Sequence, residues 1–189
     1  MDKEMIKEGV KLILKGIGED MGREGLLGTP TRVADMYEEL FSGIGEDPAE
    51  VLEPMFGENH DEIIIVKDIP FYSFCEHHLI PFIGKAHIAY VPNESGKIIG
   101  LSKLTRVFEI AARRPQVQER LTTIVADAIM KKLDPKGTMV IVEAEHLCMS
   151  MRGVKKSNTI TVTSAVRGLF RRNPASRAEA MALIKGINR

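Results

Sequence analysis

Two stretches near the N-terminus show the apolar spacing of helices. Apolar side chains recur every three or four residues across 6–17 and again across 33–41. Thr29-Pro30 predicts an N-cap followed by proline at the first position of the second helix, and Gly43 is its expected stop. The pattern predicts an N-terminal helical hairpin and then a connector at 46–57 with room for one short helical turn.

Beyond the connector, β-branched and apolar runs predict strands that are interrupted by two helices. The expected strands span 62–67, 82–91, 97–101, 139–145 and 159–166. The segment 92–96 predicts a hairpin turn between the second and third strands. Ser102 is expected to cap the first of the two helices, and Pro115 is expected to end it. The second helix has its apolar stripe over 117–129. Asn173-Pro174 opens a last helix.

The order of these elements indicates an α+β fold. Strands come in sequential pairs with two helices between the pairs, which favours an antiparallel sheet of about four strands. Such a sheet has two open edges, and open edges are normally blunted or paired, so we expect other subunits to cover them. We expect an N-terminal helical region at 1–57 and a sheet-containing domain at 58–189.

Charge and cysteine content narrow the classes of function. The 26 lysines and arginines balance 26 aspartates and glutamates, so the formal net charge is zero. We therefore expect no nucleic acid and no membrane as partner, and an anionic ligand would need a local cluster of cations. No apolar run approaches the roughly 18 residues of a membrane span, and the charged N-terminus lacks the apolar core of a signal peptide. We expect a cytoplasmic protein whose two cysteines stay reduced.

The most specific local pattern is a set of thiol and imidazole side chains. Cys75 and His78 are three residues apart, so one helical turn would bring both to one side, and Cys148 offers a third ligand from a distant strand. Zinc prefers thiolate and imidazole, and three protein ligands leave a fourth position for water, whose pKa zinc lowers to about 7. His146 would share a strand face with Cys148 and His77 adjoins a ligand, so both are candidate acid–base groups.

Each of these residues also has a simpler interpretation. Free cysteines are commonly buried and inert, and a histidine is often just a polar residue whose hydrogen bonds are satisfied. Three of the five histidines lie within three residues of a cysteine in the sequence, and this joint pattern favours a metal site over the simpler interpretation. His60 and His87, in a loop and a strand, are expected to have no partners.

A second set of residues could bind an anion and a base. Ser102, Lys103 and Arg106 stand where a strand joins a helix, and the N–H groups of a helix N-terminus suit a triphosphate. Arg152 places a further cation near the expected metal. A buried carboxylate at Glu119 could accept two hydrogen bonds from the N1 and N2 edge of guanine. The alternatives are an N-capped helix, solvated cations and an acid favoured by the helix dipole.

Four motifs together resemble one enzyme family. They are Cys75-Glu76-His77-His78, Gly100-Leu101-Ser102-Lys103, Arg114-Pro115-Gln116-Val117-Gln118-Glu119-Arg120 and His146-Leu147-Cys148-Met149. In this order and with these gaps they resemble GTP cyclohydrolase I, from about residue 27 to the C-terminus. The resemblance implies the tunnelling fold, in which antiparallel sheets of several subunits join into a barrel. It also implies a toroidal homodecamer with active sites at subunit interfaces.

The resemblance implies a role for each chemical group near the metal. Cys75, His78 and Cys148 are similar to the family's zinc ligands. His146 resembles the group that protonates N7 of guanine, and His77 resembles the second catalytic histidine, near the ribose.

The resemblance also implies how the substrate is held. Glu119, with Gln118 beside it, matches the carboxylate that anchors the guanine edge. The residues that match triphosphate contacts are Ser102, Lys103, Arg106, Arg152 and Arg32. Family members often have a basic residue three positions after that last arginine, where this chain has Asp35, and an acid there cannot bind phosphate.

The reaction implied by the resemblance is zinc-dependent hydrolysis of GTP at C8 of guanine. Ring opening and release of formate are followed by closure to 7,8-dihydroneopterin triphosphate, the first step of pterin and tetrahydrofolate synthesis. One alternative is a nitrile reductase of queuosine synthesis, which shares the fold and uses a nucleophilic cysteine with NADPH, although His77, His78 and His146 argue against it. The non-enzymatic alternative is a GTP binder or a structural zinc module, which normally has four protein ligands.

Overall fold

The computed structural model describes residues 1–53 and 55–186. The helices are α1 (Lys3–Gly16), α2 (Glu24–Leu27), α3 (Thr29–Leu40), the 3₁₀ turn η1 (Pro48–Val51), α4 (Leu101–Ala112), α5 (Gln118–Leu133), α6 (Leu147–Ser150), α7 (Leu169–Arg172) and α8 (Pro174–Lys185). The strands are β1 (Met55–Gly57), β2 (Ile64–Cys75), β3 (Pro81–Val91), β4 (Lys97–Ile99), β5 (Pro115–Gln116), β6 (Gly137–His146) and β7 (Ile160–Gly168). Within these two described ranges, every helix is too short or too polar to cross a membrane.

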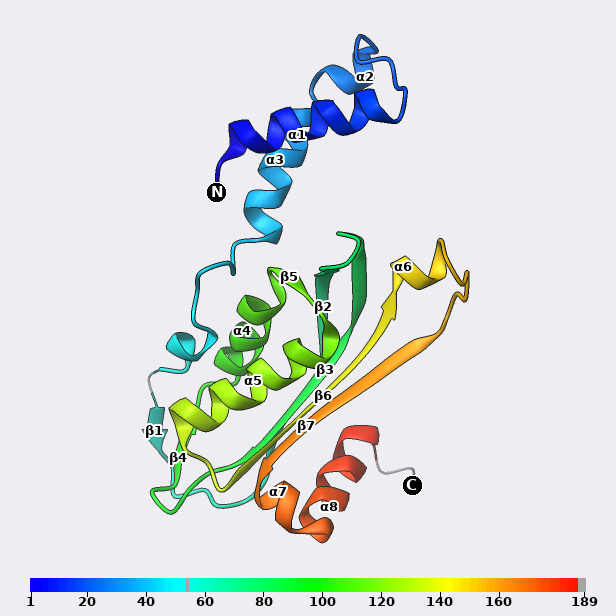
Figure 1. Ribbon diagram of the computed structural model, residues 1–189. Coiled ribbons are helices and arrows are strands. Elements are labelled where there is room, and N and C mark those ends of the chain that lie inside the picture. The colour runs from blue at the N-terminus through cyan, green and yellow to red at the C-terminus, as the bar shows by residue number, and fades with distance from the viewer. Residues whose placement is uncertain (54, 187–189) are drawn as a thin grey trace.

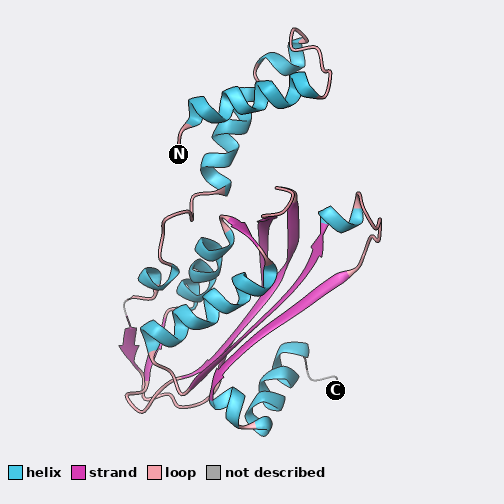
Figure 2. Ribbon diagram, viewed as in Figure 1, coloured by secondary structure: helices cyan, strands magenta, loops and turns pink. Residues whose placement is uncertain are grey.

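Four antiparallel strands form the main sheet in the order β2-β3-β6-β7, and the short β5 pairs in parallel with the end of β2. Side chains alternate between the two faces of a strand. Helices α4 and α5 cover the face that includes Ala86, Ile88 and Tyr90, and α7 and α8 cover part of the face that includes Ala89 and Val91 (Figure 2). The predicted α+β fold, with two helices between two antiparallel strand pairs, is confirmed.

The N-terminal helices form the predicted hairpin, which projects away from the sheet (Figure 1). Lys3 of α1 bridges to α3 through ion pairs with Asp35 at 3.0 Å and Glu38 at 2.6 Å. The predicted N-cap at Thr29 is wrong, because α3 already begins at this residue and the preceding glycine is the cap. The Thr29 hydroxyl instead donates a hydrogen bond to the carbonyl of Gly25 at 3.3 Å.

The connector folds against the body that contains the sheet. The 3₁₀ turn η1, which fulfils the expected helical turn, packs on α4 and α5, and β1 pairs with β4 so that Met55 lies opposite Ile99. The predicted hairpin between 82–91 and 97–101 is therefore wrong. The sequence could not show the true pairing, because β1 is three residues long and too short for a strand pattern. The division of the chain at residue 57 stays a prediction.

Strand β2 is longer than the predicted 62–67 and reaches Cys75. Its alternation is hidden by a bulge between Val66 and Ile69, where Asp68 has φ 58°, and by Pro70. Proline is tolerated because β2 lies at the edge of the sheet over most of its length, where one side of the strand makes no ladder hydrogen bonds. The extra length carries Cys75 to the far end of the sheet.

His87 closes the bulge from the neighbouring strand β3. It is buried, with 5% of its surface exposed, and its Nδ1 accepts a hydrogen bond from the Asp68 N–H at 3.1 Å. The expectation that His87 has no partner is therefore wrong. Burial lowers the pKa of His87, and the positive charges of Lys85 and Lys67 lower it further. The carboxylates of Asp68 and Glu143 act in the opposite direction and raise it.

We expect His87 to make the folded protein less stable in mild acid. Because its folded pKa lies below the unfolded value of about 6.5, the unfolded chain binds more protons. Stability is therefore complete above about pH 6.5 and falls as the pH drops through that value toward the folded pKa. Thermal unfolding at about pH 8 and about pH 5.5 measures this effect. In His87→Gln the amide oxygen can still accept the hydrogen bond from Asp68. The thermal midpoint of this variant should therefore drop less between the two pH values than that of the wild type. Equal drops would show that His87 does not cause the acid sensitivity.

Candidate active site

One end of the sheet gathers the metal-ligand candidates and their nearest partners. Strand β2 ends at Cys75, β3 begins at Pro81 and β6 ends at His146, so three strand ends meet there. The register places Phe82 directly opposite His146. Because β5 pairs with the last residues of β2, the N-terminus of α5 lies at the same end (Figure 1).

Cys75, His78 and Cys148 form a group that is able to hold a metal ion. One ligand atom from each lies within 4.8 Å of the other two. After Cys75 the chain turns, and the Leu79 N–H donates to the Cys75 carbonyl at 2.8 Å, which brings His78 beside the thiol. Burial and the neighbouring Cys75 raise the pKa of the Cys148 thiol. Two thiolates this close repel each other, so a bound cation would allow both to ionise.

Cys148 comes from a different element than the sequence predicts. Strand β6 ends at His146, and Cys148 lies in the short helix α6, so the two residues do not share a strand face. Helix α6 and the segment after it are held by Glu145, whose carboxylate accepts hydrogen bonds from the Ser150 hydroxyl at 2.6 Å and the Asn158 N–H at 3.0 Å. These bonds tie the α6 loop to the end of β6.

His146 is held on one face of its ring and at one ring nitrogen. The ring stacks on Phe82 with centroids 4.6 Å apart and planes 4° apart, and Nε2 lies 2.8 Å from Gln118 Oε1. Strand alternation places His146 on the same face as Ala144, which is the face that α5 covers. Burial lowers the pKa of His146, and the negative charge of Glu119 opposes that shift.

Gln118, which the resemblance places beside the guanine anchor, has a buried side chain that is 1% exposed. Its amide nitrogen donates to the carbonyls of Val142 and Thr161, each at 3.0 Å, and its oxygen faces His146. The side chain is thus engaged with the protein. Sequence analysis missed its contact with His146, and the only available signal was its position next to Glu119 inside a family motif.

Glu119 and His77 lie at the same end of the molecule but are exposed in this chain. The expectation of a buried carboxylate at Glu119 is therefore not met, although its charge still acts on His146. His77 occupies the turn between the first two ligand candidates, and its ring centroid lies 6.3 Å from that of His78. Both side chains are open to a ligand.

Two arginines border the metal-ligand group. Arg152 Nη1 lies 3.2 Å from His78 Nε2, so the predicted cation is beside the group. Arg120 makes two hydrogen bonds to the carboxylate of Glu76, at 2.5 and 3.0 Å, and this pairing lowers the pKa of Glu76. The pair ties the ligand turn to α5. Sequence analysis gave it no role, because nothing in the sequence shows that the two residues meet.

The three residues of α4 that are predicted to bind phosphate lie away from this end of the sheet. They are Ser102, Lys103 and Arg106. Helix α4 begins just after Ile99, whose N–H bonds to the Tyr90 hydroxyl, and Tyr90 is roughly 26 Å along β3 from Phe82. The predicted capping role of Ser102 is wrong, because Gly100 is the N-cap and no side chain bonds there.

Arg32 also lies away from the metal-ligand group, on the projecting hairpin. It is exposed on α3, and its Nη2 donates to the Gly25 carbonyl at 2.8 Å and the Thr29 hydroxyl at 2.7 Å. Asp35, the departure from the family pattern, pairs with Lys3 across the hairpin and so has a structural role.

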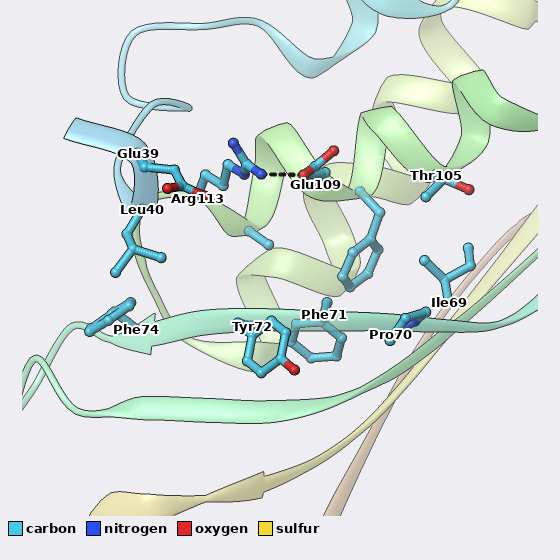
Figure 3. A pocket seen from close by; sticks show the side chains of 12 residues that line it. Glu39, Leu40, Ile69, Pro70, Phe71, Tyr72, Phe74, Thr105, Glu109 and Arg113 are labelled. Atoms are coloured by element: carbon cyan, nitrogen blue, oxygen red, sulfur yellow. Dashed lines mark hydrogen bonds and ion pairs between the residues drawn. The ribbon is translucent and has the colours of Figure 1, made fainter. Parts of the chain in front are cut away.

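A hollow of about 430 Å³ lies between β2, α4 and the end of α3 (Figure 3). Phe71 and Tyr72 line it from β2, and the ion pair of Arg113 with Glu109 lies across from them. None of the predicted site residues lines this hollow. The predicted chemistry is therefore located at the end of the sheet and not in this hollow.

Comparison with known proteins agrees with the motifs. The family model described as GTP cyclohydrolase I matches residues 6–185. The chain is 63% identical to GTP cyclohydrolase 1 of Pelotomaculum thermopropionicum over 98% of both chains. It is 62% identical to GTP cyclohydrolase 1 of Carboxydothermus hydrogenoformans over 97% of this chain and 95% of the other.

A third relative extends the agreement, with 58% identity to GTP cyclohydrolase 1 of Bacillus subtilis over 98% of this chain and 97% of the other. Among solved structures, an archaeosine synthase QueF-Like in the apo form covers 56% of this chain at 14% identity and a TM-score of 0.43, a likeness too distant to inform the site. Because the family model spans nearly the whole chain, including every residue of the metal-ligand group, the chain belongs to the GTP cyclohydrolase I family.

Proposed function

We propose that this chain hydrolyses GTP at C8 of guanine, releases formate and forms 7,8-dihydroneopterin triphosphate. The observation that carries the proposal is a set of two thiols and one imidazole within 4.8 Å of one another, close to a histidine held by a ring stack and a hydrogen bond. Membership of the GTP cyclohydrolase I family supports the same reaction.

The donor atoms of Cys75, His78 and Cys148 fit zinc. Thiolate and imidazole are the ligands of tetrahedral zinc sites, whereas magnesium and calcium prefer oxygen. Three protein ligands leave room for solvent or substrate, as in catalytic zinc sites. When bound, zinc supplies a Lewis acid that lowers the pKa of water.

The side chains around the metal-ligand group divide the remaining tasks. His146, in its protonated imidazolium form, donates a proton to N7 of guanine and returns to the neutral ring, and this proton makes C8 more open to attack. Glu119 accepts hydrogen bonds from the N1 and N2 edge of the ring, and its exposure in the single chain leaves it accessible to that ligand. His77 acts near the ribose, and Arg152 supplies positive charge for the triphosphate.

The remaining phosphate contacts come from other copies of the chain. Those predicted on α4 follow Ile99, which bonds to Tyr90, roughly 26 Å along β3 from Phe82, and Arg32 lies on the projecting hairpin. A homo-oligomer with active sites between subunits, a decamer by family resemblance, would unite them. The open edge at β7 supports this arrangement, because Ile160 and Val162 on that strand are 52% and 58% exposed.

The two cysteines also bear on where the protein works. Both are free thiols, and the proposed zinc site needs them reduced. This requirement suits the reducing cytoplasm, which we propose as its compartment.

Incubation of the purified chain with GTP tests the proposed reaction. Formate and a fluorescent pterin should appear together, a chelator should stop both, and added zinc should restore them. ATP is the matched control substrate and should yield no formate. A nitrile reductase would instead consume NADPH without zinc, and a GTP binder would retain the nucleotide unchanged. Zinc-loaded protein that yields no formate from GTP would sink the proposal.

A further inference from the structure

We infer that Gln118 is a positioning residue for His146, which it fixes so that the Nε2–H faces the protein and Nδ1 remains open to a ligand. The inference rests on the role proposed above for His146 in proton transfer. It differs from a substrate contact by the Gln118 side chain, because that side chain is buried and engaged with the protein.

The orientation of the Gln118 amide follows from its partners. Its nitrogen faces the carbonyl oxygens of Val142 and Thr161, each at 3.0 Å, and a carbonyl can only accept hydrogen bonds. A flipped amide would place its oxygen against both carbonyls and leave two buried acceptors unpaired. The nitrogen must therefore point to these carbonyls, and Oε1 must point to His146.

The hydroxyls around Gln118 give the same orientation. The Thr122 hydroxyl donates to the backbone carbonyl of Gln118 at 2.7 Å, so in its 2.6 Å contact with the Thr163 hydroxyl it must accept. Thr163 therefore donates its own proton to Thr122 and keeps a lone pair toward Gln118 Nε2, which lies 3.2 Å away and shares one of its two hydrogens with this third acceptor. Every hydroxyl proton then has an acceptor, and the glutamine is held from several sides.

This orientation decides the tautomer of the neutral His146 ring. Oε1 can only accept, so the His146 nitrogen that lies 2.8 Å from it must carry the hydrogen. Within the described parts of the chain, His146 Nδ1 has no hydrogen-bond partner in the protein. The side-chain atoms there that are both fully buried and unpaired are Arg114 Nε and Gln116 Oε1, so Nδ1 is not enclosed in the same way. Together with the stack on Phe82, the bond to Gln118 leaves Nδ1 as the ring nitrogen that faces a ligand. Nδ1 is therefore the nitrogen that takes up the proton which the ring then passes to guanine.

Replacing Gln118 by methionine tests the positioning role. The side chain keeps its approximate volume but loses the acceptor for His146, so the ring becomes free to rotate and to change tautomer. We expect kcat to fall about 10- to 100-fold, which is the loss seen when a residue that orients an active-site group is removed or when that group is misplaced by about 1 Å. KM for GTP should change less than about twofold. In a His146→Ala background the same substitution should cause no further loss, because Gln118 acts through His146.

Gln116→Met is the matched control. Gln116 is also fully buried, and its amide nitrogen donates to the Ala111 carbonyl at 2.8 Å, but the side chain makes no hydrogen bond to His146. It should lower the thermal midpoint of the zinc-loaded protein without the fall in kcat. Equal kcat values for Gln118→Met and the wild type, or equal losses in the two variants, would overturn the inference.

A measurement on the unaltered protein applies even if Gln118→Met does not fold. Nitrogen-15 solid-state NMR of the zinc-loaded, histidine-labelled chain at about pH 8.5, where an ordinary histidine is neutral, reports which ring nitrogen holds the hydrogen. The His146 signals are identified by their absence in His146→Ala. We expect hydrogen on Nε2, and hydrogen on Nδ1 would overturn the inference. This readout needs no turnover, so failure of the GTP assay alone would refute the proposed reaction and leave the tautomer test standing.

Discussion

Replacing Cys148 by serine is expected to remove both metal binding and turnover. Serine is nearly the same size, but its hydroxyl is a poor zinc ligand at neutral pH, and only Cys75 and His78 would remain to hold the ion. Loss of a residue that hydrogen-bonds a metal ligand already lowers metal affinity or activity about 10- to 100-fold. Loss of the ligand itself should therefore lower kcat more than about 100-fold. Elemental analysis of the dialysed protein and formate release from GTP measure the two effects.

The neighbouring residue supplies the control for this substitution. Met149 lies in the same short helix and is 36% exposed, so Met149→Leu should keep the metal and the activity. The same comparison applies at Cys75, which approaches the group from β2. Stoichiometric zinc together with full turnover in Cys148→Ser would show that this thiol is not a ligand.

The fold could be predicted where apolar runs are long. Strands β3 and β6 are each buried over a run of six residues, so apolar side chains on both faces mark their place in the sequence and with it the paired order of strands and helices. The sequence could not show the pairing of β1 with β4, because two three-residue strands carry too little pattern. The bulge at Asp68 likewise hid the second half of β2, since a bulge interrupts the alternation on which the prediction depends.

The site could be predicted where its chemistry is local in sequence. Cys75 and His78 share one turn, so their spacing alone brings them together, and Cys148 was recognisable from its residue type and family motif. The contact of Gln118 with His146 joins the first turn of α5 to the end of β6, which is a tertiary relation that no spacing rule contains. The ion pair of Arg120 with Glu76 is hidden for the same reason.

The predicted phosphate-binding residues illustrate a different limit. The family resemblance predicts this role for Ser102 and Arg32 but does not show which subunit's site each one would serve. In the single chain they lie at the start of α4 and on the projecting hairpin, away from Cys75. The site between subunits that we propose would reconcile the motifs with this geometry, and the activity would then depend on assembly.

His146→Ala is expected to retain zinc but to lose ring opening. The imidazole is not one of the three ligand candidates, so the metal content should match that of the wild type. General acid–base catalysis contributes about 10²- to 10⁴-fold, and we expect formate release to slow within that range. GTP binding, measured by equilibrium dialysis, should weaken far less, because Glu119 and the cations remain. His60→Ala is the matched control and should keep full activity, because His60 lies on the loop before β2, at the opposite end of the sheet from His146.

Rescue by added imidazole separates proton transfer from a structural role. Removal of the ring leaves the face of Phe82 and the oxygen of Gln118 in place, and these are the two groups that hold the native imidazole. A free imidazole should occupy the same space and restore part of the formate release in His146→Ala, but none in Cys148→Ser, where the metal is lost. Normal formate release from His146→Ala without imidazole would show that another group protonates the guanine ring.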